Sequence, residues 1–109
     1  MKLPVNASIA SEKIAGYLLI RQPENDKSGF LAQAGYTVAN AGQLEADIRA
    51  QLLPAEAEFS ESTEHGDKYR IRGTLAGPNG RLLRVVSIWM TESATGQTKF
   101  ITLYPDKNA

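Results

Sequence analysis

The stretch LAGPNGRLLRVVSIWM, residues 75–90, decides the fold of this 109-residue chain. Its Gly-Pro-Asn-Gly tetrapeptide joins two segments in which apolar and polar residues alternate. Pro78 cannot adopt the positive φ that a two-residue type I′ turn requires, whereas Pro78-Asn79 suits the centre of a type I turn. Gly80 then suits the left-handed position of a G1 bulge. The tetrapeptide therefore predicts a three-residue hairpin loop.

This loop predicts the register of the two strands that it joins, because Gly77 comes to lie opposite Arg81. Counting outward, one face receives the pairs Leu75–Leu83, Gly73–Val85, Ile71–Ser87 and Tyr69–Trp89. The other face receives the pairs Thr74–Arg84, Arg72–Val86, Arg70–Ile88 and Lys68–Met90. The first face is mostly apolar, so we expect it to be the core face on which other elements pack.

The rest of the chain supplies two more strands and a helical half. Residues 55–61 alternate in the same way, and KFITLY, residues 99–104, is the last strand. If the SATGQ turn pairs Ser93 with Gln97, Ile101 and Leu103 join the core face, and Phe100, Thr102 and Tyr104 join the arginines. Amphipathic patterns in residues 8–53 predict two to three helices. We therefore expect one α+β domain over residues 1–109, with helices (8–53) packed on one face of a four-stranded antiparallel meander (55–104).

Composition excludes several classes of function. There is no cysteine, so a disulfide framework, thiolate metal sites and cysteine catalysis are excluded. Twelve basic and twelve acidic side chains cancel, which argues against nucleic-acid binding by bulk charge. No apolar run reaches the roughly 20 residues of a membrane span, and the start does not resemble a signal peptide, so we expect a cytoplasmic protein without membrane association. We expect no metal site and no cofactor, since GPNG leads into a strand and is not a nucleotide P-loop.

Two local features have ordinary structural interpretations. His65, the single histidine, precedes a glycine in a predicted hairpin loop and has no metal-ligand spacing around it. The glutamates at 56, 58 and 61 are expected to be unpaired and to form a solvated sheet edge that discourages aggregation.

The charged face of the sheet has two interpretations. Charged residues that alternate along a strand are usually its solvated side. The alternative is a platform for an anion or RNA, because guanidinium groups bind phosphate in a bidentate manner. The candidate binding residues are Lys68, Arg70, Arg72 and Arg84. Arg81 differs, since counting along the strand places it on the core side at the hairpin tip. We expect its side chain to extend over the rim or to reach toward a helix end.

Several short motifs resemble an uncharacterised bacterial domain family that occurs in toxin-like gene pairs and at the ends of secreted polymorphic toxins. The resemblance covers nearly the whole chain, through the motifs Lys27-x-x-Phe30, Gly35-Tyr36, Gly66-x-Lys68-Tyr69, Gly77-Pro78-Asn79-Gly80-Arg81, Ile88-Trp89 and Thr102-x-Tyr104-Pro105. The layout of helices followed by an antiparallel sheet is also similar to the barnase–EndoU–colicin–RelE group of ribonuclease toxins.

This resemblance implies metal-independent cleavage of RNA, in which a 2′-hydroxyl attacks the adjacent phosphate. Lys27 would then be a cation or acid, Arg81 would stabilise the phosphorane, and Thr102 and Tyr104 would bind or orient the phosphate. The implied partners are an RNA substrate and a small acidic antitoxin or immunity protein. The chain departs from many such toxins, since it has no strong positive charge and no histidine in a catalytic place. A non-enzymatic interaction or regulatory module is therefore the alternative.

Overall fold

A four-stranded antiparallel sheet in the order β1-β2-β3-β4 forms the centre of the fold. The computed structural model describes residues 1–24 and 26–107. The strands are β1 (Ala57–Thr63), β2 (Gly66–Ala76), β3 (Leu82–Glu92) and β4 (Thr98–Pro105). Each strand is hydrogen-bonded to the next one in the sequence, so the sheet is the predicted meander.

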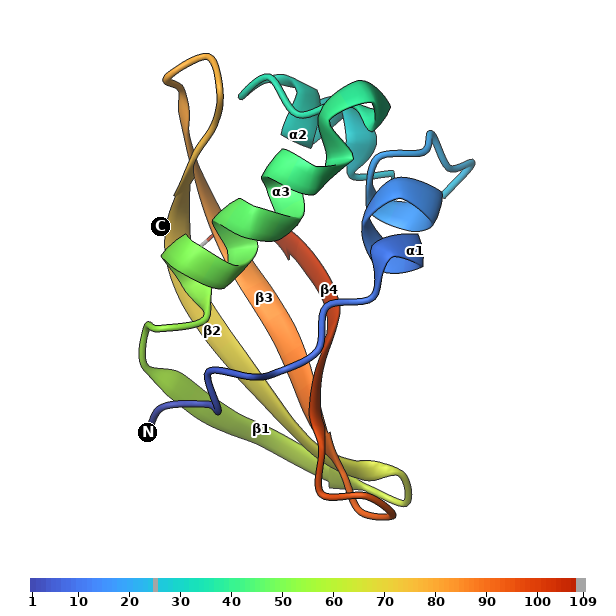
Figure 1. Cartoon of the computed structure of the whole chain (residues 1–109), viewed down its shortest axis with the longest axis vertical. Helices are drawn as coiled ribbons and strands as arrows, with labels where there is room; N and C mark the ends of the chain where they lie inside the picture. The colour runs from blue at the N-terminus through green and yellow to red at the C-terminus, as the bar shows by residue number, and fades with distance from the viewer. Residues whose placement is uncertain (25, 108–109) are drawn as a thin grey trace.

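Short helices cover one face of this sheet (Figure 1). Helix α1 (Ser11–Lys13) continues as a π-helical turn over Ile14–Leu18, and helix α2 (Ser28–Ala32) follows. A 3-10 turn over Val38–Asn40 leads into helix α3 (Ala41–Asp47), which ends in a π-helical turn over Ile48–Leu52. The predicted α+β class, with helices first and four strands after them, is confirmed.

The hairpin of β2 and β3 has the turn that its sequence predicts. The Gly80 N–H donates to the Gly77 carbonyl oxygen at 2.9 Å, and the Gly77 N–H donates to the Arg81 carbonyl oxygen at 2.9 Å. Gly80 has a φ of 86°, as a G1 bulge requires. All eight predicted cross-strand pairs are present, from Thr74–Arg84 and Leu75–Leu83 to Lys68–Met90.

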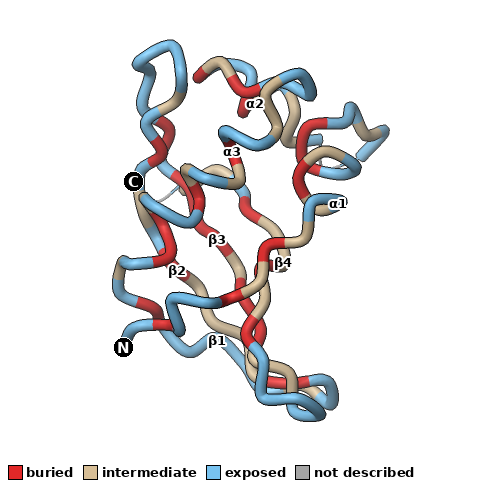
Figure 2. The backbone as a smooth tube through the Cα atoms, in the orientation of Figure 1, coloured by how far each residue is buried: buried red, intermediate tan, exposed pale blue. Residues whose placement is uncertain are grey.

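The core lies between the helices and the predicted face of the sheet. Its buried side chains include Leu44, Ile48 and Leu52 of α3 and its π-helical turn, with Ile71, Leu75 and Trp89 of the sheet. Gly73 lets the π-helical turn after α3 lie close to β2, since a β-carbon on Gly73 would stand 2.8 Å from Leu52 Cδ2. Buried residues follow the strands under the helices, while the turns at the far end of the sheet are exposed (Figure 2).

The prediction for the last strand is wrong at Phe100. A bulge interrupts the pairing of β3 with β4, so Ile88 pairs with Thr102 while Trp89 pairs with Phe100. Phe100 is consequently buried on the core face, with its ring 5.2 Å from the Trp89 ring at an interplanar angle of 74°. The extra residue of a bulge moves the side chains on one side of the bulge to the opposite faces of the sheet. Counting alternate residues along the sequence cannot detect this change. Thr102 and Tyr104 remain, as predicted, on the face of the sheet that the helices do not cover, which is called the helix-free face below.

The N-terminal segment crosses the helix-covered face of the sheet from β1 to β4, which the sequence did not predict (Figure 1). The Ala57 N–H donates to the Met1 carbonyl oxygen at 2.7 Å at the β1 edge. At the β4 edge, Ser8 donates to Thr98 at 2.9 Å and accepts from Phe100 at 2.8 Å. This segment buries Leu3, Ala7 and Ile9 against the sheet.

Candidate functional site

The three basic residues that β2 contributes to the helix-free face are paired with acids of the neighbouring strand β1. Lys68 Nζ lies 3.7 Å from Glu61, and the Nε atoms of Arg70 and Arg72 lie 3.8 Å and 3.6 Å from Glu58. The prediction that these glutamates are unpaired is therefore wrong. Antiparallel pairing of β1 with β2 places Glu58 directly opposite Arg70, which is a relation between strands and not a local one. Lys68 and Arg70 thus lie in a face whose charge is largely neutralised.

A cleft of about 610 Å³ lies at the other side of this face, next to β4. Its lining comes from the segment before α2, from the middle strands and from the end of β4. The lining residues are Asp26, Lys27, Arg72, Val86, Tyr104, Pro105, Asp106 and Lys107. Three of the predicted site residues, Lys27, Arg72 and Tyr104, are thereby brought to one concave surface.

Arg72, Val86 and Tyr104 form a row across β2, β3 and β4, because Val86 pairs with Arg72 on one side and with Tyr104 on the other. Val86 is buried, whereas Tyr104 is 39% exposed. The row therefore presents an apolar floor between a guanidinium and a phenol. Such a surface accepts the flat face of a ring as well as an anion.

Lys27 reaches the cleft from the residue before α2. Its Nζ donates to the Tyr17 hydroxyl at 3.4 Å and stands 5.4 Å from the centroid of that ring. The face of an aromatic ring attracts a cation and so helps to hold it in place. Lys27 is thus a positioned cation at the mouth of the cleft.

Asp26 holds the start of α2. Its Oδ1 accepts hydrogen bonds from the Ser28 hydroxyl at 2.7 Å, from the Ser28 N–H at 3.2 Å and from the Gln22 N–H at 3.1 Å. The hydrogen bond from the Ser28 hydroxyl is the largest cause that lowers the pKa of Asp26 below its usual value. The carboxylate is therefore ionised in the working pH range of the cell.

Asp106 lies on the opposite wall. Its Oδ1 accepts from Arg72 Nη1 at 3.1 Å, and its backbone N–H donates to the Arg84 carbonyl oxygen at 2.9 Å. The chain thus continues along β3 after β4 ends at Pro105. The Asp106 side chain is only 11% exposed, so it shields one side of the guanidinium of Arg72.

The other predicted site residues lie outside this cleft. Arg81 is exposed at the tip of the β2–β3 hairpin, and its side chain makes no ion pair with any residue of the described ranges. Thr102 shares the face with Tyr104 but lies opposite Ile88, and its hydroxyl contacts the neighbouring Leu103 carbonyl oxygen at 3.4 Å. Arg84 lines a smaller depression beside the cleft.

Of the lining residues that were not predicted as parts of the site, three are charged: Asp26, Asp106 and Lys107. Asp26 stands just before a helix, where aspartate is a common capping residue, and this pattern alone gives no hint of a cleft. Asp106 and Lys107 follow the last strand, and their place depends on the continued pairing with β3. No local pattern marked them.

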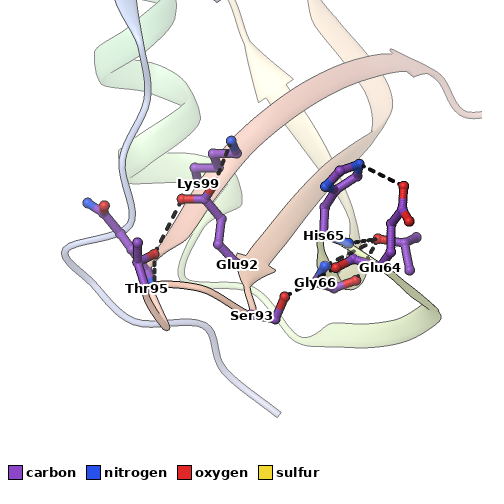
Figure 3. A network of polar contacts seen from close by, with 9 residues as sticks. Glu64, His65, Gly66, Glu92, Ser93, Thr95 and Lys99 are labelled. Carbon is purple, nitrogen blue, oxygen red and sulfur yellow. Dashed lines mark hydrogen bonds and ion pairs between the residues drawn. The ribbon is translucent and has the colours of Figure 1, made fainter.

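The far end of the sheet carries a second group of polar contacts (Figure 3). His65 Nε2 lies 3.3 Å from Glu64, and the Ser93 N–H donates to the His65 carbonyl oxygen at 3.0 Å. Lys99 donates to Glu92 at 3.1 Å. Of these contacts, the one between Ser93 and His65 joins the two turns at that end, and His65 lies in the predicted hairpin loop as an exposed residue.

Residues 1–24 and 26–107 contain no group of three or more His, Cys, Asp or Glu side chains placed to hold a metal ion. Within the same ranges, no helix has the length and apolar character to cross a membrane.

Comparison with known proteins adds one finding. A model of the family described as Domain of unknown function (DUF6883) matches residues 3–107. No curated protein and no solved structure matches the chain.

Proposed function

The chain belongs to the DUF6883 family, whose function is unknown, and on that premise we propose that it is a metal-independent ribonuclease of the bacterial toxin type. The observation that supports the proposal is the cleft that gathers Lys27, Arg72 and Tyr104 from three distant parts of the sequence. Two positioned cations and a phenol on one concave surface provide the donors that a phosphodiester in its transition state requires.

The reaction follows from these groups. The ribose 2′-oxygen forms a bond to the adjacent phosphorus, and the bond from phosphorus to the 5′-oxygen breaks. The 2′-hydroxyl proton passes to a carboxylate of the cleft, for which Asp26 and Asp106 are the candidates, and Lys27 gives a proton to the departing 5′-oxygen. Arg72 stabilises the charge of the phosphorane, and Tyr104 orients the phosphate. The products are a 2′,3′-cyclic phosphate and a 5′-hydroxyl.

This assignment differs from the one that the resemblance implies. Arg81 and Thr102 have no part in it, because they lie outside the cleft. Arg72 takes the role of the arginine that stabilises the phosphorane.

The test measures cleavage of a fluorescent single-stranded RNA by the full chain in the presence of a chelator. Lys27→Ala and Tyr104→Phe should slow cleavage by about a hundredfold, since each removes a donor that acts in the transition state. Arg81→Ala, which removes a cation outside the cleft, should cleave at the rate of the unsubstituted chain. The fluorescence of Trp89, the single tryptophan, reports whether each variant is folded.

Two outcomes would overturn the proposal. One is intact RNA after incubation with well-folded protein. The other is equal cleavage by the unsubstituted chain and by Lys27→Ala, which would identify the activity as a contaminant.

The ion pairs of the helix-free face favour a second candidate, a non-enzymatic protein-interaction module. Lys68, Arg70 and Arg72 already face Glu58 and Glu61, so this face offers little net charge to a nucleic acid. This candidate predicts a stable complex with a partner protein at high salt and no RNA cleavage. A small acidic protein that binds the chain and blocks cleavage would instead support the ribonuclease, as its antitoxin or immunity protein.

A further inference from the structure

A second depression adjoins the cleft on the helix-free face. Its volume is about 230 Å³, and it is lined by Arg72, Gly73, Thr74, Arg84 and Asp106. Arg72 and Asp106 also line the cleft, so the two depressions are neighbours that share a wall. The ion pair of Arg72 with Asp106, at 3.1 Å, forms that wall.

Arg84 is the distinctive cation of this second depression. Its side chain is exposed and makes no ion pair with any residue that the structure describes, whereas Arg72 contacts both Glu58 and Asp106. Thr74 lies directly opposite Arg84 on β2 and adds a hydroxyl to the same depression. A guanidinium with an adjacent hydroxyl is a donor set that suits the oxygen atoms of a phosphate.

The volume of the second depression limits the size of the ligand that it can bind. Sites for whole small molecules occupy about 300 Å³ or more, and this depression is smaller. It is large enough for a phosphate group and smaller than a site for a whole small molecule. A base and sugar would have to lie elsewhere, and the larger cleft with its exposed Tyr104 ring offers that space.

We infer that the second depression binds a neighbouring phosphate of the same RNA strand whose scissile phosphate lies in the cleft. The inference rests on the proposed function and names its substrate class: a single-stranded polynucleotide, not a mononucleotide. Arg84 and Thr74 act there as binding residues, and they have no role in the chemical step.

The experiment measures the binding of a fluorescent hexauridylate whose 2′-hydroxyls are methylated, so that it cannot be cleaved. Uridine 3′-monophosphate is the competing mononucleotide. Arg84→Ala should weaken the binding of the hexamer by about tenfold, because a charge-assisted contact is lost. It should reduce the slope of log affinity against log salt by about 0.7. Its affinity for the mononucleotide should equal that of the unsubstituted chain.

Two further variants test whether the loss of binding is specific to the position and the shape of the Arg84 side chain. Arg81→Ala removes the same charge from the same hairpin but outside both depressions, and it should bind the hexamer as the unsubstituted chain does. Arg84→Lys should keep part of the affinity and the whole salt slope, because it keeps the charge but not the planar fork.

The failures of the two proposals are distinguishable. If the chain cleaves RNA but Arg84→Ala binds the hexamer as well as Arg81→Ala does, the second phosphate site is refuted and the ribonuclease stands. Equal weakening of hexamer and mononucleotide by Arg84→Ala would place Arg84 in the first site and also refute the inference. Absence of both binding and cleavage by the unsubstituted chain would overturn both proposals, whereas equal binding of a hexaglutamate would refute only the second phosphate site.

Discussion

Gly77 lies so close to Ala34 that a β-carbon on Gly77 would overlap the carbonyl group of Ala34. The next residues of the turn continue this contact, since Asn79 Nδ2 donates to the Gln33 carbonyl oxygen at 3.0 Å and the Asn79 N–H donates to the Ala34 carbonyl oxygen at 3.3 Å. The tip of the β2–β3 hairpin is therefore docked on the C-terminal end of α2. Lys27 precedes the same helix, so this contact helps to hold Lys27 in place relative to the sheet.

We expect Gly77→Ala to destabilise the fold by about 1–3 kcal/mol, as overpacking typically does. The hairpin tip would have to move away from α2 to accept the methyl group. Denaturant unfolding followed by Trp89 fluorescence measures the change. Gly42→Ala is the matched control, because nothing lies within 4 Å of the added β-carbon and the residue is in α3. It should be neutral or stabilise by about 0.5–1 kcal/mol. Equal effects of the two substitutions would contradict the docking.

Tyr36 is a buried residue whose hydroxyl donates to Asp47 at 2.6 Å. Burial, with the neighbouring Asp47, raises the pKa of Tyr36 above its usual value of 10.0. A raised pKa in the folded state means that this stabilisation is complete below pH 10 and is lost as the pH rises toward the folded-state value. Tyr36→Phe should therefore cost about 1–2 kcal/mol at neutral pH, and the difference from the unsubstituted chain should shrink above pH 10.

Unfolding in urea at pH 7 to 11 measures that difference. Tyr17→Phe, at a more exposed ring, is the control and should change stability by less than about 0.5 kcal/mol. A constant difference between Tyr36→Phe and the unsubstituted chain across this range would refute the linkage.

Ser87 satisfies two polar groups within the core. Its hydroxyl accepts from Trp89 Nε1 at 2.9 Å and donates to the Ile71 carbonyl oxygen at 3.1 Å. Ser87→Ala leaves the indole N–H without its partner in a buried place, so we expect a loss of about 1–3 kcal/mol and a shifted Trp89 emission spectrum. Ser93→Ala in the exposed β3–β4 turn should have little effect. An unchanged spectrum and stability for Ser87→Ala would show that another group replaces the hydroxyl.

Glu58 neutralises both Arg70 and Arg72 in the face next to the cleft. Glu58→Gln should raise the affinity for the methylated hexauridylate about two- to fivefold at low salt, since an exposed ion pair of this kind contributes at most about 1 kcal/mol. Glu64→Gln removes the same charge at the far end of the sheet and should leave the affinity unchanged. A decrease with Glu58→Gln would mean that the glutamate positions the arginines for the RNA.

Local chemistry was sufficient to predict the central hairpin and the class of the fold. The GPNG turn and the alternation on both sides of it specify the pairing of β2 with β3, because a turn of known type fixes which residues lie opposite one another. The same counting failed at β4, where the bulge beside Trp89 reverses the face of Phe100. A bulge depends on how a strand fits its neighbour and the core, and the strand's own sequence does not show it.

The candidate site, like the fold, could be predicted from the sequence only in part. The sequence by itself determined which residue types lie on the helix-free face, and so placed Arg72, Arg84 and Tyr104 together. Only the tertiary structure decided that Glu58 neutralises part of that face, that Lys27 enters the cleft beside Tyr104, and that Arg81 stays outside. The physical reason is the range of the interactions: turn geometry and alternation act between near neighbours, whereas ion pairs and a cleft depend on how distant segments pack.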